Sequence, residues 1–140
     1  MEQPVTIQPW LDSLQLFGMK LGLDNMQLMN RLLGDPASRL RFVHVAGTNG
    51  KGSTVAFIRA IAEAAGLTVH AYTSPHLVRF NERIRLAGQL IGDEALNAVL
   101  DRVEAAIDRG GSEATVFEST TAAAFVAMSE TPADLAIVEV

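Results

Sequence analysis

The feature that most constrains the fold is a succession of strand, glycine loop, helix and strand between residues 41 and 74. RFVHVA, residues 41 to 46, is a β-branched and aromatic run typical of a strand. After a glycine loop, STVAFIRAIAEAAG, residues 53 to 66, predicts a helix closed by a glycine. LTVHAYTS, residues 67 to 74, predicts the next strand. A βαβ unit of this length implies a right-handed crossover and a parallel sheet.

Further segments extend this pattern along the chain. Helices are predicted from Pro9 to Gly18, from Asp24 to Leu33, from Asp93 to the Gly110-Gly111 pair, and from Thr115 to Ser129. Between Pro75 and Gly92 the composition is mixed, and we expect a short irregular ribbon. DLAIVEV, residues 134 to 140, predicts a buried parallel strand. The elements together predict an α/β fold with a mostly parallel sheet flanked by helices.

The sequence stops on this last predicted strand, with no turn or polar tail after Val140. A domain rarely ends on a central strand, because the following residues normally carry the chain off the sheet and help to cover its ends. We therefore expect the chain to be a fragment of a longer protein.

Composition narrows the class of protein. The chain has 140 residues, of which 49% are apolar, and this is enough for one globular domain. A net charge of −5 with scattered basic residues argues against a nucleic-acid surface, so any phosphate site must be local. The absence of cysteine excludes disulfides and thiolate metal sites and is compatible with a reducing cytoplasm. The first ten residues do not resemble a secretory signal, and no apolar run is long enough to span a membrane.

The loop AGTNGKGST, residues 46 to 54, has the composition of a phosphate-binding loop. Gly47, Gly50 and Gly52 remove three side chains, so backbone N–H groups can approach an anion at the start of a helix. Lys51 supplies a full positive charge, and Ser53 and Thr54 add hydroxyl groups. The alternative is a flexible turn that carries a solvated lysine. The strand before the loop and the helix after it favour the phosphate site.

Gly52 leaves the metal without its usual ligand. The common loop pattern G-x-x-x-x-G-K-[ST] places a hydroxyl directly after the lysine, within reach of magnesium. Because the carboxyl ends of parallel strands meet at one crevice, the missing oxygen ligands are expected from the ends of neighbouring strands. Ser74 and Glu139 are the candidates. The alternatives are a turn hydroxyl before a proline for Ser74 and a solvent-facing residue for Glu139.

Several segments resemble a known family. HVAGTNGKGST, YTSPHLVRFNERI and the strand ending in IVEV together resemble the N-terminal part of the dihydrofolate synthase/folylpolyglutamate synthase family of the Mur ligase superfamily. MKLGLDNM and FEST are similar to further segments of that family. Muramyl ligases share GTNGK but typically follow the lysine directly with threonine or serine, so GKGS with TSPHL favours the folate branch. The resemblance implies a P-loop-containing fold of the Mur ligase central-domain type.

The resemblance also implies an activity, an ATP-dependent amide ligase. ATP phosphorylates a carboxylate of dihydropteroate or a folate, and the amino group of L-glutamate attacks the acyl phosphate and releases phosphate. ATP and Mg²⁺ are the implied cofactors, and a cytoplasmic, monomeric parent protein is expected. Residues 1–140 would be the N-terminal part of the ATP-binding ligase domain. The rest of that domain and a C-terminal glutamate-ligase domain would lie outside them, so we expect the fragment itself to be inactive.

Residue roles follow from the same resemblance. Lys51 would contact the β and γ oxygens of the nucleotide and serve catalysis, while Ser74 and Glu139 would hold magnesium. Phe117 is either a contact to the pterin or part of a helical core face. The implied phosphate-binding set is Gly47, Thr48, Asn49, Gly50, Lys51, Gly52, Ser53 and Thr54. The implied substrate side consists of Leu23, His76, Phe117 and Glu118.

Other interpretations stay open from the sequence. A muramyl-type peptide ligase that uses a nucleotide sugar is one alternative, and a nucleotide-binding module without ligase chemistry is another. His44 and His70 lie within predicted strands, where a structural role is more common than a catalytic one. The charged residues between Arg79 and Arg85 either shape a substrate loop or form a solvated hairpin face.

Overall fold

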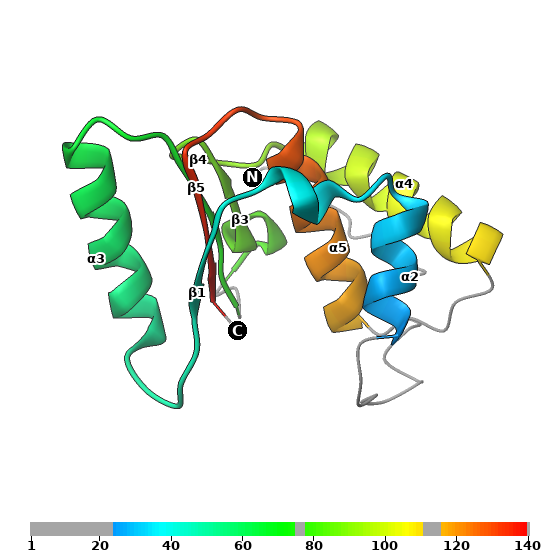
Figure 1. The fold of residues 1–140 in the computed structure, drawn as a ribbon, viewed down its shortest axis with the longest axis horizontal. Helices are drawn as coiled ribbons and strands as arrows, with labels where there is room; N and C mark the ends of the chain where they lie inside the picture. Colours follow the sequence, from blue (N-terminus) through cyan, green and yellow to red (C-terminus); the bar gives the residue numbers. More distant parts are fainter. Residues whose placement is uncertain (1–23, 75–77, 111–115, 140) are drawn as a thin grey trace. The chain divides into compact units, whose positions relative to one another are not determined.

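The computed structural model describes residues 24–74, 78–110 and 116–139 (Figure 1). The chain divides into two compact units. The sheet unit comprises Leu40–Gly92 and Met128–Val140, and the helical unit comprises Met1–Arg39 and Asp93–Ala127. The helix predicted from Pro9 to Gly18 lies outside the described residues. Within the described ranges, no helix combines the length and the apolar character needed to cross a membrane.

The sheet unit is built on five strands in the order β1-β5-β2-β3-β4. The strand β5 lies between β1 and β2 and runs parallel to both, while β3 and β4 continue the sheet in antiparallel fashion. Four of the five residues of β5 are buried, which confirms the predicted buried parallel strand. The strands are β1 (Phe42–Val45), β2 (Val69–Tyr72), β3 (Ile84–Leu86), β4 (Gln89–Leu90) and β5 (Leu135–Glu139).

Helix α3 (Lys51–Ala64) covers one face of the parallel strands (Figure 1). It begins two residues earlier than predicted, so Lys51 and Gly52 belong to its first turn rather than to the loop. Gly66, with φ of 87°, follows its end, as the sequence predicted. The buried apolar residues between the helix and the sheet are Val45, Val55, Ala62, Val69, Ala71 and Ile137.

The segment predicted as an irregular ribbon contains regular structure. A short 3₁₀ helix, η3 (Phe80–Arg83), leads into β3, and the hairpin of β3 and β4 pairs with β2. The hairpin turn consists of Ala87 and Gly88, both with positive φ, of 51° and 91°. Alanine seldom adopts this conformation, which is why the sequence carries no turn signal at that position.

In its described residues, the helical unit contains three α-helices and one short 3₁₀ helix. The amphipathic face predicted for α4 is buried at Leu96, Val99, Leu100 and Val103. Helices α2 and α4 contact each other, and Arg109 Nη2 donates a hydrogen bond to the carbonyl of Leu32 at 3.0 Å. The elements are α2 (Asp24–Leu32), η2 (Pro36–Arg39), α4 (Asp93–Gly110) and α5 (Val116–Ser129), whose last two residues belong to the sheet unit.

Candidate phosphate and metal site

The loop between β1 and α3 has a backbone that only glycine adopts with ease. Gly47 and Gly50 have φ of 148° and 75°, and Gly50 occupies the N-cap of α3 in the left-handed region. An added Cβ at Gly47, Gly50 or Gly52 would meet no atom within 4 Å. Residues 46 to 50 are all exposed. Gly47 and Gly50 are therefore required for backbone conformation, and all three glycines leave an open approach to the N–H groups rather than serving close packing within the chain.

The first turn of α3 presents the polar side chains of the motif. Lys51 is the first helical residue and is half-buried, whereas Ser53 is exposed. Both the backbone N–H and the hydroxyl of Thr54 donate to the carbonyl of Gly50, at 3.0 Å and 2.8 Å. The Thr54 hydroxyl thus uses its hydrogen within the first turn, and only the lone pairs of its oxygen remain to contact a ligand. Thr54 stabilises the loop geometry, and Ser53 is the better placed of the two to donate to a phosphate.

The carboxyl ends of the parallel strands meet at the edge of the sheet where this loop begins. Val45 is in register with Glu139, and Tyr72 with Val138. Ser74 follows the end of β2 by two residues. The predicted metal ligands and the phosphate loop therefore lie at the same edge of one sheet.

Glu139 is buried, with 6% of its surface exposed, so the solvent-facing alternative is wrong. Side chains alternate along a strand, and Glu139 shares its face with Leu135 and Ile137, which pack with α3. Glu139 thus lies on the face of the sheet that α3 covers. Ser74 is half-buried.

A carboxylate and a hydroxyl are hard oxygen donors, and this pair fits a Mg²⁺ ion that takes its other ligands from phosphates and water. No group of three His, Cys, Asp or Glu side chains suited to a metal occurs in the described part of the chain.

The predicted substrate-side residues are only partly described. Leu23 and His76 lie outside the described residues. Phe117 and Glu118 are in the first turn of α5, in the helical unit, and Glu118 is 6% exposed. Their contacts to a substrate stay predictions.

The two histidines of the strands differ in environment. His44 of β1 is exposed. His70 of β2 is fully buried, and its ring joins two backbone groups. Its Nδ1 accepts from the N–H of Ala87 at 2.9 Å, which leaves Nε2 to donate to the carbonyl of Thr131 at 2.8 Å. The position of His70 indicates a structural role that links the hairpin turn to the segment before β5.

The charged residues from Arg79 to Arg85 make contacts of different kinds. The carboxylate of Glu82 accepts hydrogen bonds from the backbone N–H groups of Val78 and Arg79, at 3.1 Å and 3.0 Å, where η3 begins. The guanidinium of Arg83 lies 4.9 Å from the ring centre of Phe80, in a cation–π contact.

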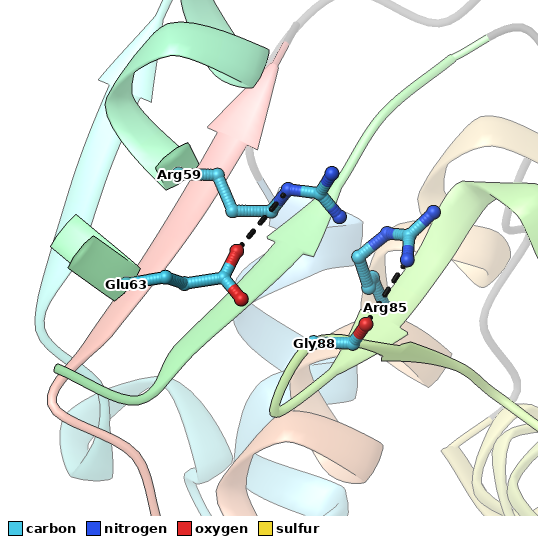
Figure 2. Close-up of polar contacts among 4 residues, drawn as sticks. All are labelled: Arg59, Glu63, Arg85 and Gly88. Carbon is cyan, nitrogen blue, oxygen red and sulfur yellow. Dashed lines mark hydrogen bonds and ion pairs between the residues drawn. The ribbon is translucent and has the colours of Figure 1, made fainter. Parts of the chain in front are cut away.

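Arg85 donates to the carbonyl of Gly88 at 3.0 Å (Figure 2). It also lines a hollow of about 170 Å³ together with Gly52, Arg59 and Thr73. Sequence reasoning missed Arg59 and Thr73 as members of any site. The strand end at Thr73 and the placement of Arg59 two turns after Lys51 are the signals that could have indicated them.

The chain is similar to known proteins in both sequence and structure. No family model matches the chain. A dihydrofolate synthase/folylpolyglutamate synthase of Bacillus subtilis is 44% identical over 125 residues, which are 86% of this chain and 29% of that protein.

Two solved structures superpose closely. The match to Escherichia coli FolC in complex with DHPP and ADP has a TM-score of 0.86 at 36% identity, and it covers 99% of this chain and 33% of the FolC chain. A second match is to a bifunctional folylpolyglutamate synthase/dihydrofolate synthase of Yersinia pestis, complexed with AMPPNP and Mn. Its TM-score is 0.85 at 34% identity, and it covers 100% of this chain and 35% of the Yersinia pestis chain. The chain thus spans about a third of the length of these proteins and has a Mur ligase-type fold. By sequence and by structure it belongs to the dihydrofolate synthase/folylpolyglutamate synthase family.

Proposed function

We propose that the chain is the nucleotide-binding part of an ATP-dependent ligase that joins L-glutamate to dihydropteroate or to the glutamate tail of folates. One observation carries the proposal. An open glycine loop, a lysine at the head of α3 and the buried carboxylate of Glu139 belong to the same edge of one sheet. The names of the relatives support the substrate class, and the ADP, AMPPNP and Mn of the solved structures support a nucleotide with a divalent metal.

In the proposed reaction a carboxylate oxygen of the acceptor attacks the γ-phosphorus of ATP, and ADP leaves. The amino group of L-glutamate then attacks the carbonyl carbon of the acyl phosphate, loses a proton and displaces phosphate. This chain would contribute positioning and charge, because the N–H groups of the loop and the ammonium of Lys51 would hold the phosphates. Ser74 and Glu139 would hold Mg²⁺, which when bound neutralises charge on the phosphate oxygens.

The rest of the proposal concerns the full-length protein that contains this chain. Residues 1–140 would be the N-terminal part of the ATP-binding domain, and further segments would complete the ATP and glutamate sites. We propose a monomer in the cytoplasm, with which the lack of cysteine is compatible.

The test is a substrate comparison on the full-length protein that contains this chain. With ATP, Mg²⁺ and L-glutamate present, dihydropteroate or a folate should give ADP, phosphate and a glutamylated product. Turnover with a UDP-muramyl substrate alone would show a muramyl-type ligase instead. ATP hydrolysis that is indifferent to every acceptor would show a nucleotide-binding module without ligase chemistry.

A variant tests the role of the loop in that assay. Lys51→Ala should lower kcat by at least ~100-fold, because one charge-stabilising donor at a transferring group is typically worth that much. Arg41→Ala is the matched control, since Arg41 is an exposed cation just before β1 and outside the loop. Wild-type turnover by the Lys51→Ala protein would refute the assignment.

A further inference from the structure

The hollow beside the first turns of α3 adjoins the implied phosphate-binding set at Gly52 but is lined by no residue of the loop 46–50. It lies in the sheet unit between α3, the end of β2 and the η3–β3 segment. Its volume of about 170 Å³ is more than a single water needs and is enough for a small polyatomic ion. Its lining includes Gly52, Val55, Arg59, Thr73, Glu82 and Arg85.

Two guanidinium groups enter this hollow from different elements. Arg59 extends from α3 toward the strand that carries Arg85 (Figure 2). Arg59 pairs through Nε with Oε1 of Glu63 at 3.4 Å, and Arg85 donates through Nη1 to the carbonyl of Gly88. A guanidinium has five N–H donors, so each of these contacts uses a small part of the donor capacity. The remaining donors can converge on an oxyanion.

The charges around the hollow favour an added negative group. Burial lowers the pKa of Arg85, the positive charge of Arg59 lowers it further, and Glu63 acts in the opposite direction. The lining itself, with Arg59, Arg85 and Glu82, carries a net charge of +1, while Glu63 pairs with Arg59 from outside the lining. The carboxylate of Glu82 accepts two backbone N–H groups where η3 begins. Two like charges held together at one hollow repel, and an anion bound between them relieves this repulsion.

We propose that this hollow is a second anion-binding site, in which Arg59 and Arg85 together bind a small oxyanion of the phosphate or carboxylate type. Arginine suits this role because its planar fork binds both groups in a bidentate manner. The hydroxyl of Thr73 adds a further donor at the same wall. The site goes beyond the proposed ligase chemistry and does not depend on it, since neither arginine belongs to the glycine loop.

The experiment is a titration of inorganic phosphate and, separately, of malonate into the full-length protein with Lys51→Ala, at constant ionic strength. This background weakens binding at the glycine loop, so the calorimetric signal reports the second site. Arg59→Gln and Arg85→Gln should each weaken binding by ~10-fold or more, since a hydrogen bond to a charged group is worth about one factor of ten. Arg41→Gln, which removes an exposed cation outside the hollow, should leave the affinity unchanged.

The outcomes divide clearly. Preference for phosphate identifies a phosphoryl ligand, and preference for malonate identifies a carboxylate ligand. If neither ion binds, or if Arg41→Gln weakens binding as much as Arg85→Gln does, the proposal is overturned. Arg59→Gln keeps the test valid should Arg85→Gln fail to fold, because Arg59 lies on α3 with 30% of its side chain exposed.

Discussion

Val45 and Glu139 lie opposite each other in register at the carboxyl ends of β1 and β5. The residue that precedes the loop segment and a buried carboxylate thus share one edge of the sheet. Burial of an ionised carboxylate is costly unless hydrogen bonds, an opposite charge or a metal compensates it. This relationship links the conformation of the loop to the metal that we propose there.

Replacing Glu139 by Gln should reduce the effect of Mg²⁺ on nucleotide binding while the fold is kept, because the amide preserves the shape and removes the charge. In the full-length protein we expect the Mg²⁺-dependent part of the ATP affinity to fall by at least ~10-fold. Calorimetric titration with and without EDTA measures it. Glu94→Gln, an exposed carboxylate on α4, is the control. An unchanged response to Mg²⁺ would remove Glu139 from the metal site.

Substitution by alanine at Gly50 and at Gly52 should change the free energy of unfolding in opposite directions. Gly50→Ala should lower the free energy of unfolding by about 1 kcal/mol, because its φ of 75° is unfavourable for a residue with a Cβ. Gly52→Ala should raise it by up to ~1 kcal/mol, because Gly52 is helical and an added Cβ meets no neighbour. Urea denaturation measures both. A shift of the same sign in both variants would contradict the described backbone.

His70→Ala should destabilise the protein, because it removes a fully buried ring together with its hydrogen bonds to the N–H of Ala87 and the carbonyl of Thr131. Each lost hydrogen bond costs about 0.5–1.5 kcal/mol, and the cavity left by the ring adds to this. His44→Ala, on the exposed position of β1, is the matched control and should stay within about 0.5 kcal/mol of the wild type. Equal effects of the two changes on the thermal midpoint would show that the His70 bridge contributes nothing.

Glu104 on α4 gives a prediction for pH. Burial raises the pKa of Glu104 above its ordinary 4.5, and the charges of Asp108 and Asp101 on the same helix raise it further. The folded state therefore binds the proton more tightly than the unfolded state does. Protonation of Glu104 therefore stabilises the folded state. This stabilisation is complete below the ordinary pKa of glutamate and is lost as pH rises through the raised pKa of the folded state.

Glu104→Gln should then be more stable than the wild type at pH 7 by a few tenths of a kcal/mol, and the gain should vanish near pH 3. Glu94→Gln in the first turn of the same helix should show the opposite sign at pH 7, because it removes a negative charge that the helix dipole favours. Denaturant midpoints at the two pH values are the measurement. A gain for Glu104→Gln that is independent of pH would show that packing, not charge, is its cause.

Local patterns predicted much of the sheet unit. The β-branched runs, the glycine loop and the apolar spacing of α3 fixed the strands and helix to within a few residues, because burial and backbone conformation act over short stretches. The shared sheet edge of Ser74, Glu139 and the loop also followed from parallel topology.

Two features of the sheet unit were not predicted from the sequence. The hairpin at Ala87 was missed because its turn uses an alanine with positive φ. The hollow between Arg59 and Arg85 was missed because it depends on how far apart a helix and an antiparallel strand lie in space, which no local pattern encodes.

The central position of β5 has a consequence for synthesis on the ribosome. Strands β1 and β2 do not pair with each other, and the strand that joins them begins at Leu135, long after Tyr72 has been made. Such non-local pairing slows folding and leaves strand edges accessible in the meantime. The parallel strands of the nascent sheet unit therefore cannot pair until β5 has left the ribosomal tunnel. During that interval, chaperones that bind open strand edges can bind the chain.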